Sequence, residues 1–176
     1  MESPLLNPPL EYTHLHISNL SLTELDQLRD LNVLLFREER LITRYDVPDL
    51  IALLLRIDGI RAGFKIGYGK ADGIFYSAKG GIMPAFRRKG YARTLLITMM
   101  RQALELGYHT FRYDTFPKHF REMLIFGLQE GFEVTSTAYY PRMNDYRIEL
   151  SVSIPEYLNR VATGLEVGSE EMSESD

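Results

Sequence analysis

The segment IMPAFRRKGYARTLL, Ile82 to Leu96, limits what the chain can fold into more than any other stretch of the sequence. Three adjacent cations, Arg87, Arg88 and Lys89, are followed at once by Gly90 and then by apolar residues at helical spacing. The first turn of a helix leaves four backbone N–H groups without intrahelical partners and carries roughly half a positive charge from the summed peptide dipoles. The segment therefore predicts a strand, a short loop and a helix whose first turn attracts an anion.

A phosphate or pyrophosphate group fits the chemistry of this turn. Gly90 has no Cβ, so a ligand oxygen can come close to the chain, and the neighbouring cations add full charges at the same place. Taken alone, the cations could equally form a solvated basic turn. The context favours the anion site, because a predicted strand, the pair Gly80-Gly81, a short loop with Pro84 and a regular helix follow one another.

The rest of the chain alternates between strand and helix patterns. Asp58-Gly59 between two apolar runs predicts a hairpin, and the strand expected after the second helix should pair in parallel through a crossover connection. The last two strands should form an antiparallel pair around residues 141–145. We expect strands at 12–20, 50–57, 60–69, 73–83, 109–115, 132–140 and 146–154 and helices at 22–40, 92–106 and 119–130.

Composition indicates one soluble domain and excludes several kinds of chemistry. The 176 residues hold no cysteine, so a disulfide, a thiolate metal site and a cysteine nucleophile are ruled out. A net charge of -4 argues against nucleic acid as a partner. No run approaches the ~20 apolar residues of a membrane span, so we expect a cytoplasmic protein without membrane contact.

The four histidines and the chain ends complete this interpretation. His14, His16, His109 and His119 lack the spacing of metal ligands, and we expect no metal. Residues 1–163 should form the single domain. Residues 164–176 are acidic, with little to bury, and should form a solvated, flexible tail.

The stretch GGIMPAFRRKGYARTLL resembles the signature of the GNAT superfamily of acetyl-coenzyme A (acetyl-CoA) dependent N-acyltransferases. That signature reads Arg or Gln, two variable residues, Gly, one variable residue, then Gly or Ala, and residues 87–92 match it in order. The order of elements resembles the family over about residues 12–153. The resemblance implies an α/β (α+β) fold with a mixed, mostly antiparallel central sheet, splayed fourth and fifth strands and flanking helices. It also implies an N-acetyltransferase in which a primary amine attacks acetyl-CoA directly in a ternary complex.

The same resemblance assigns a coenzyme site. Backbone N–H groups from Arg88 to Ala92 would hold the pyrophosphate, and backbone groups at the end of the fourth strand would meet the pantetheine arm and polarise the thioester carbonyl. Gly80 and Gly81 suit the bulge that opens the family's slot between the fourth and fifth strands. The expected cofactor-binding residues are Ile82, Met83, Arg87, Arg88, Lys89, Gly90, Tyr91 and Ala92.

Acyl transfer needs a neutral amine, whereas an amine with a pKa near ~10.4 is neutral in only about one molecule in a few thousand at pH 7. A base must therefore take the proton. Glu38 and Glu39, at the end of the first predicted helix, lie where the family places part of its acceptor site. The alternative is a solvated helix end paired with Arg37 and Arg40. Asp114 and Tyr76, on the fifth and fourth strands, are further candidates.

The chain departs from the family in ways that leave catalysis open. Many members carry a tyrosine where Gly127 stands, and the segment FYSAKGG lacks the acid that some members use as a base. Solvent, Tyr139 or Tyr140 would then protonate the thiolate. A non-catalytic acetyl-CoA or CoA sensor is the alternative function, and an unrelated phosphate-binding module is a third. The sequence leaves open the acceptor amine, small molecule or protein, and whether the protein is a homodimer.

Overall fold

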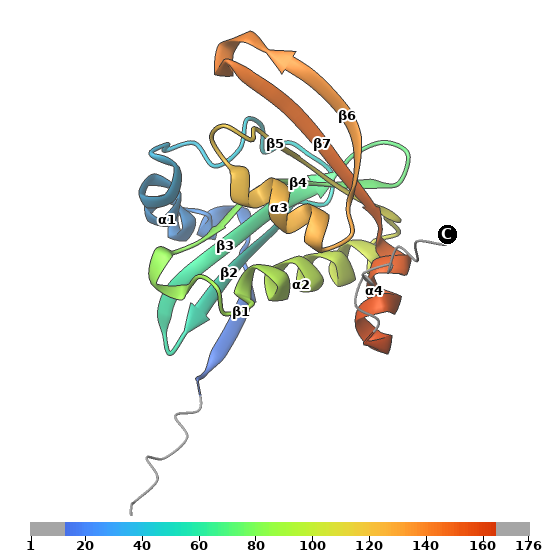
Figure 1. The fold of residues 1–176 in the computed structure, drawn as a ribbon. Helices are drawn as coiled ribbons and strands as arrows, with labels where there is room; N and C mark the ends of the chain where they lie inside the picture. Colours follow the sequence, from blue (N-terminus) through green and yellow to red (C-terminus); the bar gives the residue numbers. More distant parts are fainter. Residues whose placement is uncertain (1–12, 165–176) are drawn as a thin grey trace, which may run out of the picture.

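The computed structural model of the protein describes residues 13–164. A seven-stranded sheet has the order β1-β2-β3-β4-β5-β7-β6 and carries helices on its faces (Figure 1). The strands are β1 Leu15–Asn19, β2 Ile51–Ile57, β3 Ile60–Gly69, β4 Ile74–Ile82, β5 Thr110–Thr115, β6 Glu133–Tyr140 and β7 Asp145–Ser153. The helices are α1 Asp26–Phe36, α2 Tyr91–Glu105, α3 Arg121–Gln129 and α4 Ile154–Thr163. Among the described strands, β4 and β5 form the one parallel pair, so the expected mixed, mostly antiparallel sheet is confirmed.

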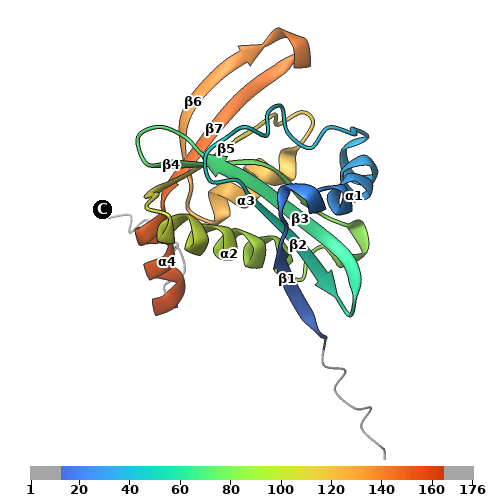
Figure 2. The same ribbon diagram turned by 180° about the vertical axis from the view of Figure 1, so that it is seen from behind.

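The sheet separates two hydrophobic clusters. Along β2, Leu53 and Leu55 pack on the side of α2, whereas Ala52 and Leu54 pack on the side of α1. This follows from the period of two in a strand, and it explains why β2 is apolar almost throughout. Figure 2 shows the molecule from behind, where α1 lies on the opposite face of the sheet from α2 and α3. Burial of each leucine stabilises the fold by about 1.5–3 kcal/mol.

A slot opens between β4 and β5 because the two strands part. They pair only from Ile74–Thr110 to Tyr76–Arg112, while β4 continues to Ile82. We call the gap beyond Tyr76 the slot.

The hairpin predicted at Asp58-Gly59 joins β2 to β3, and the parallel β4–β5 pair is confirmed as well.

The bulge in β4 lies at Ala78, and the expectation that Gly80 and Gly81 form it is wrong. The register passes from Ile66–Lys79 to Gly67–Ser77, which leaves Ala78 as the extra residue. Gly80 and Gly81 pair regularly with β3. They are needed for close packing instead: a Cβ on Gly81 would lie 2.9 Å from Leu35 Cδ1 of α1.

The first helix is shorter than expected at both ends. Residues 22–24 form a separate 3-10 turn, and α1 ends at Phe36 because Arg37 adopts left-handed backbone angles, with φ at 55°. Glu38 and Glu39 therefore lie in the loop after the helix. The chain turns back at this point toward the sheet.

The helix α4 was not expected from the sequence. The Ser153 side chain accepts a hydrogen bond from the Glu156 N–H, Pro155 lies in the first turn, and Gly164 ends the helix with φ at 66°. Tyr157 of α4 is buried against Phe132. The predicted tail lies outside the described residues apart from Gly164.

The β6–β7 hairpin extends beyond the rest of the sheet (Figure 1), and β6 is exposed along its whole length. It was expected as an antiparallel pair, and this is confirmed. No helix within residues 13–164 combines the length and the apolar character that crossing a membrane requires.

Candidate functional site

The turn before α2 presents its backbone N–H groups outward. Gly90 caps the helix with φ at 81°, and Arg88 also has a positive φ of 61°. Within the described chain, the N–H groups of residues 88–93 have no protein acceptor; the first to find one is Thr94, which donates to the Gly90 carbonyl at 3.1 Å. A Cβ on Gly90 would meet no atom within 4 Å. The turn is therefore open to a ligand oxygen.

The three cations of this turn differ in their roles. The Arg87 Nε–H donates to the Ile82 carbonyl at 2.9 Å, so this side chain folds back and braces the loop on β4. Arg88 and Lys89 are exposed, and neither has an ion-pair partner among residues 13–164. They can supply charge to an anion at the start of α2.

Backbone groups of β4 face the slot at alternate residues. The Met83 N–H donates to the Ala62 carbonyl at 2.8 Å, and the Met83 carbonyl accepts from Phe86 at 2.9 Å. Both backbone groups of Met83 are thus used by the protein itself. Because neighbouring residues of a strand point their backbone groups to opposite edges, Ile82 and Gly80 direct theirs toward the slot. The Ile82 carbonyl already accepts from Arg87, so its N–H is the group that Ile82 offers to a ligand.

Tyr113 occupies the space beside Gly127. A Cβ on Gly127 would lie 1.9 Å from the Tyr113 hydroxyl, which itself donates to the Met123 carbonyl at 2.7 Å. Burial raises the pKa of Tyr113. A tyrosine at position 127 would therefore not fit, because a tyrosine from β5 already fills that part of the core.

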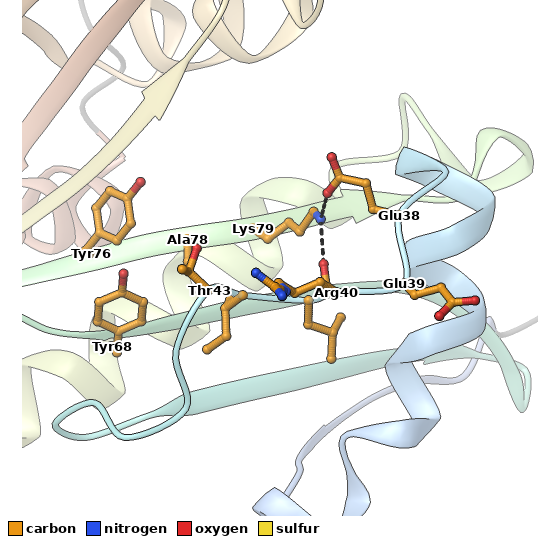
Figure 3. A pocket seen from close by; sticks show the side chains of 10 residues that line it. Glu38, Glu39, Arg40, Thr43, Tyr68, Tyr76, Ala78 and Lys79 are labelled. Atoms are coloured by element: carbon orange, nitrogen blue, oxygen red, sulfur yellow. Dashed lines mark hydrogen bonds and ion pairs between the residues drawn. The ribbon is translucent and has the colours of Figure 1, made fainter. Parts of the chain in front are cut away.

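A pocket of about 640 Å³ opens on the α1 side of the sheet (Figure 3). The loop after α1 and strands β3 and β4 form its walls. The residues that line it are Glu38, Glu39, Arg40, Leu41, Ile42, Thr43, Tyr68, Tyr76, Ala78 and Lys79. Both predicted glutamates thus lie at one pocket, together with the bulged residue of β4.

An ion pair fixes the wall near Glu38. The Lys79 Nζ lies 2.6 Å from Glu38 Oε2 and donates to the Arg40 carbonyl at 3.2 Å (Figure 3). The buried Asn32 amide donates to the carbonyls of Glu38 at 2.5 Å and Arg40 at 3.2 Å, which ties the loop to α1. Glu39 points away from Lys79 in the same view.

Two tyrosines and a buried carboxylate lie where the pocket approaches the slot. The Tyr76 hydroxyl donates to Asp114 Oδ2 at 2.9 Å, and Arg147 Nη2 lies 2.6 Å from the same oxygen. Asp114 Oδ1 is buried without a partner in the described residues. Burial, followed by the charge of Asp114, raises the pKa of Tyr76 and of Tyr68, so both phenols remain protonated at neutral pH.

Sequence reasoning did not single out Lys79, Tyr68 or Asn32. Their contacts join segments far apart in the chain, and no local pattern marks them. Tyr139, a candidate donor of the thiolate proton, lies elsewhere: its hydroxyl donates to Asn144 at 2.8 Å in the β6–β7 hairpin. In residues 13–164 no three His, Asp or Glu side chains gather as a metal site would require.

Comparison with known proteins identifies the fold. No protein-family model matches the sequence, and no curated protein matches it either. The ribosomal-protein-S18-alanine N-acetyltransferase from Escherichia coli is 16% identical, with a TM-score of 0.62, over 80% of this chain and 94% of that chain.

Two further solved structures carry coenzyme or an analogue of it. A GNAT family acetyltransferase from Elizabethkingia anophelis with acetyl-CoA bound is 16% identical, with a TM-score of 0.65, over 79% of this chain and 97% of that chain. An Arabidopsis thaliana protein in complex with the bisubstrate analogue CoA-Ac-MVNAL is 21% identical, with a TM-score of 0.65, over 79% of this chain and 98% of that chain. The chain therefore has the fold of the GNAT N-acetyltransferases.

Proposed function

We propose that the protein is an N-acetyltransferase that uses acetyl-CoA. One observation carries this proposal: the open N–H groups of residues 88–93 adjoin the slot that β5 leaves along the edge of β4. A diphosphate on those groups would let a pantetheine arm run along Ile82 and Gly80 like an added strand. The acetyl-CoA in the Elizabethkingia anophelis structure supports the choice of ligand.

The residues present suit each part of the coenzyme. Arg88 and Lys89 supply positive charge for phosphate oxygens, and the start of α2 supplies the oriented N–H groups and the helix dipole. The amide of Ile82 is a donor for a carbonyl oxygen in the slot. Gly80 adds backbone groups on the same edge without a side chain in the way.

The acceptor amine belongs in the pocket on the α1 side. The pocket holds two carboxylates, Glu38 and Glu39, and two cations, Arg40 and Lys79, so its formal charges balance. A protonated amine would be attracted by a carboxylate of the wall, above all by Glu39, which is not paired with Lys79. Glu38 is the proposed proton acceptor, directly or through one water, because the ion pair with Lys79 holds its carboxylate at the wall. Glu39 contributes charge. Transfer is direct from thioester to amine, as expected for a chain without cysteine.

Asp114 is the competing proton acceptor. Its unpartnered Oδ1 and its contact with Tyr76 put a carboxylate between slot and pocket. Its pairing with Arg147 favours a structural role instead, in which Asp114 connects β4, β5 and β7. Glu38 therefore remains the first choice.

The experiment that tests the function has two parts. Calorimetry should show that acetyl-CoA binds and that ATP does not compete with it. A panel of amines, followed by thiol release, should give turnover with at least one primary amine. Absence of coenzyme binding would refute the proposal. Tight binding without turnover on any amine would favour the non-catalytic sensor.

Variants at the pocket test the proton acceptor. Glu38→Gln should leave acetyl-CoA affinity unchanged and slow transfer by about a hundredfold, the lower range for loss of a general base. Glu105→Gln, at an exposed position of α2, removes the same charge away from the pocket and is the matched control. If Glu38→Gln and Glu39→Gln both transfer at the unmodified rate, the assignment of the base is wrong.

A further inference from the structure

The amine of Lys65 has no polar partner in the sheet. Lys65 lies in β3 between Phe64 and Ile66, which are buried on the α1 side, so its own side chain lies on the α2 side. In residues 13–164 it has neither a hydrogen bond nor an ion pair, and Nζ lies 5.7 Å from the centre of the Phe111 ring. Among the side-chain N and O atoms of residues 13–164, only Asn32 Oδ1 and Asp114 Oδ1 are fully buried without a hydrogen-bond partner. The unpartnered Lys65 nitrogen is therefore not fully buried, and water can reach it.

The path of this side chain leads across β4. Lys65 pairs with Gly80 of β4, and a Cβ on Gly80 would lie 3.3 Å from Lys65 Cγ. Phe111, at the other end of the path, belongs to β5. The glycine thus lets the lysine pass over β4 and bring its nitrogen to the closed end of the slot, where β4 and β5 part.

The same end of the slot is where the acyl group of a bound thioester would lie. The proposed diphosphate site is at the start of α2, next to the end of β4 that is not paired with β5. The helix α2 covers the face of the sheet on which Lys65 lies. A pantetheine arm that runs inward from that site carries its thioester toward the point at which the strands meet. The nearest amine of the described chain on that face is then Lys65.

We propose that Lys65 is an acetyl acceptor, so that the protein acetylates its own slot when acetyl-CoA is bound. The inference rests on the proposed function. The neutral Lys65 amine attacks the thioester carbonyl carbon: a C–N bond forms, the C–S bond breaks, CoA leaves as the thiolate, and the proton lost by nitrogen passes to that thiolate or to water. The product is an amide, uncharged and larger than the amine.

The environment of Lys65 prepares it for this reaction. Burial lowers its pKa to about 8, and no charged neighbour contributes to the shift. Near pH 7.5 such an amine is neutral in about a quarter of molecules, whereas an ordinary lysine amine is neutral in about one in a thousand. Acetylation would place a larger group near Phe111, at the closed end of the slot, so the modified protein should bind acetyl-CoA less well. The reaction is thus self-limiting.

The test uses the purified full chain and isotope-labelled acetyl-CoA, with peptide mapping by mass spectrometry. Lys65 should gain one acetyl group at least about tenfold faster than the exposed Lys118, which reports spontaneous acetylation. Unlabelled CoA in excess should slow labelling of Lys65 and leave Lys118 unaffected. In Lys65→Arg, which keeps the charge, the fast labelling should disappear; the map of the unmodified protein gives the result even if this variant fails to fold.

The possible outcomes separate this inference from the proposed function. If acetyl-CoA binds and an amine is acetylated, yet Lys65 is labelled no faster than Lys118, the inference is refuted and the function stands. If Lys65 is labelled rapidly while no added amine is acetylated, the inference holds and the acceptor pocket has another role. Failure of acetyl-CoA to bind refutes both.

Discussion

Lys65→Met should stabilise the protein at neutral pH, because methionine avoids the cost of burying the charged Lys65 amine. The size of the effect follows from the shift in the pKa of that amine. The amine has a pKa of about 8 in the folded chain against 10.5 for a free lysine. At 1.36 kcal/mol per pKa unit, protonation of the amine destabilises the folded state by at most about 3–4 kcal/mol. Methionine keeps the unbranched stem and removes the charge.

The sign of the pH dependence follows from the depressed pKa. Between pH 8 and 10.5 the unfolded chain binds the proton and the folded chain does not, so stability rises with pH across this window. Below pH 8 both states are protonated and the full cost remains. The advantage of Lys65→Met should therefore be largest near pH 7 and nearly vanish above pH 10.

Urea unfolding at both pH values measures this difference. Lys89→Met is the control: Lys89 is exposed and its side chain has no hydrogen bond or ion pair within residues 13–164, so the free energy of unfolding should change by less than about 0.5 kcal/mol. A Lys65→Met protein that is no more stable than the unmodified chain at pH 7 would refute the reasoning. So would an advantage that is equally large at both pH values.

The remaining predictions concern α3 and the turn before α2. Gly127→Ala should destabilise the fold by about 1–3 kcal/mol in urea unfolding, because the new Cβ overlaps the Tyr113 hydroxyl; if Tyr113→Phe does not relieve part of this loss, the packing argument is wrong. Arg88→Glu should weaken acetyl-CoA binding by about tenfold or more at low salt and by less at high salt, as calorimetry can show. Arg101→Glu, farther along α2, carries the same charge change and should bind normally; equal losses in both variants would contradict a local phosphate site.

Local patterns predicted the elements near the turn before α2. The Asp58-Gly59 hairpin and the step from β4 to α2 depend on turn residues next to one another in the chain, so the sequence shows them directly. The parallel β5 followed from the crossover rule. The fourth helix was missed although Ser153, Pro155 and Glu156 form a recognisable helix start.

Features that depend on distant residues could not be predicted. The bulge at Ala78 depends on how β4 pairs with β3, which the sequence of β4 alone does not show. Gly80 and Gly81 led to the wrong position for the bulge, because these glycines allow close packing instead. Lys79 meets Glu38 across 41 positions, so the ion pair at the pocket has no local signal. The depressed pKa of Lys65 likewise depends on what covers it.

The most direct measurement of the central claim is a titration of coenzyme A into isotope-labelled protein, followed by the backbone amide signals in NMR spectra. If the start of α2 holds the diphosphate, the N–H signals of residues 88–93 should shift most, and those of Ile82 and Gly80 should shift with them. Amides of the distant β6–β7 hairpin are the internal reference. Saturable binding that leaves the signals of residues 88–93 in place would contradict the account.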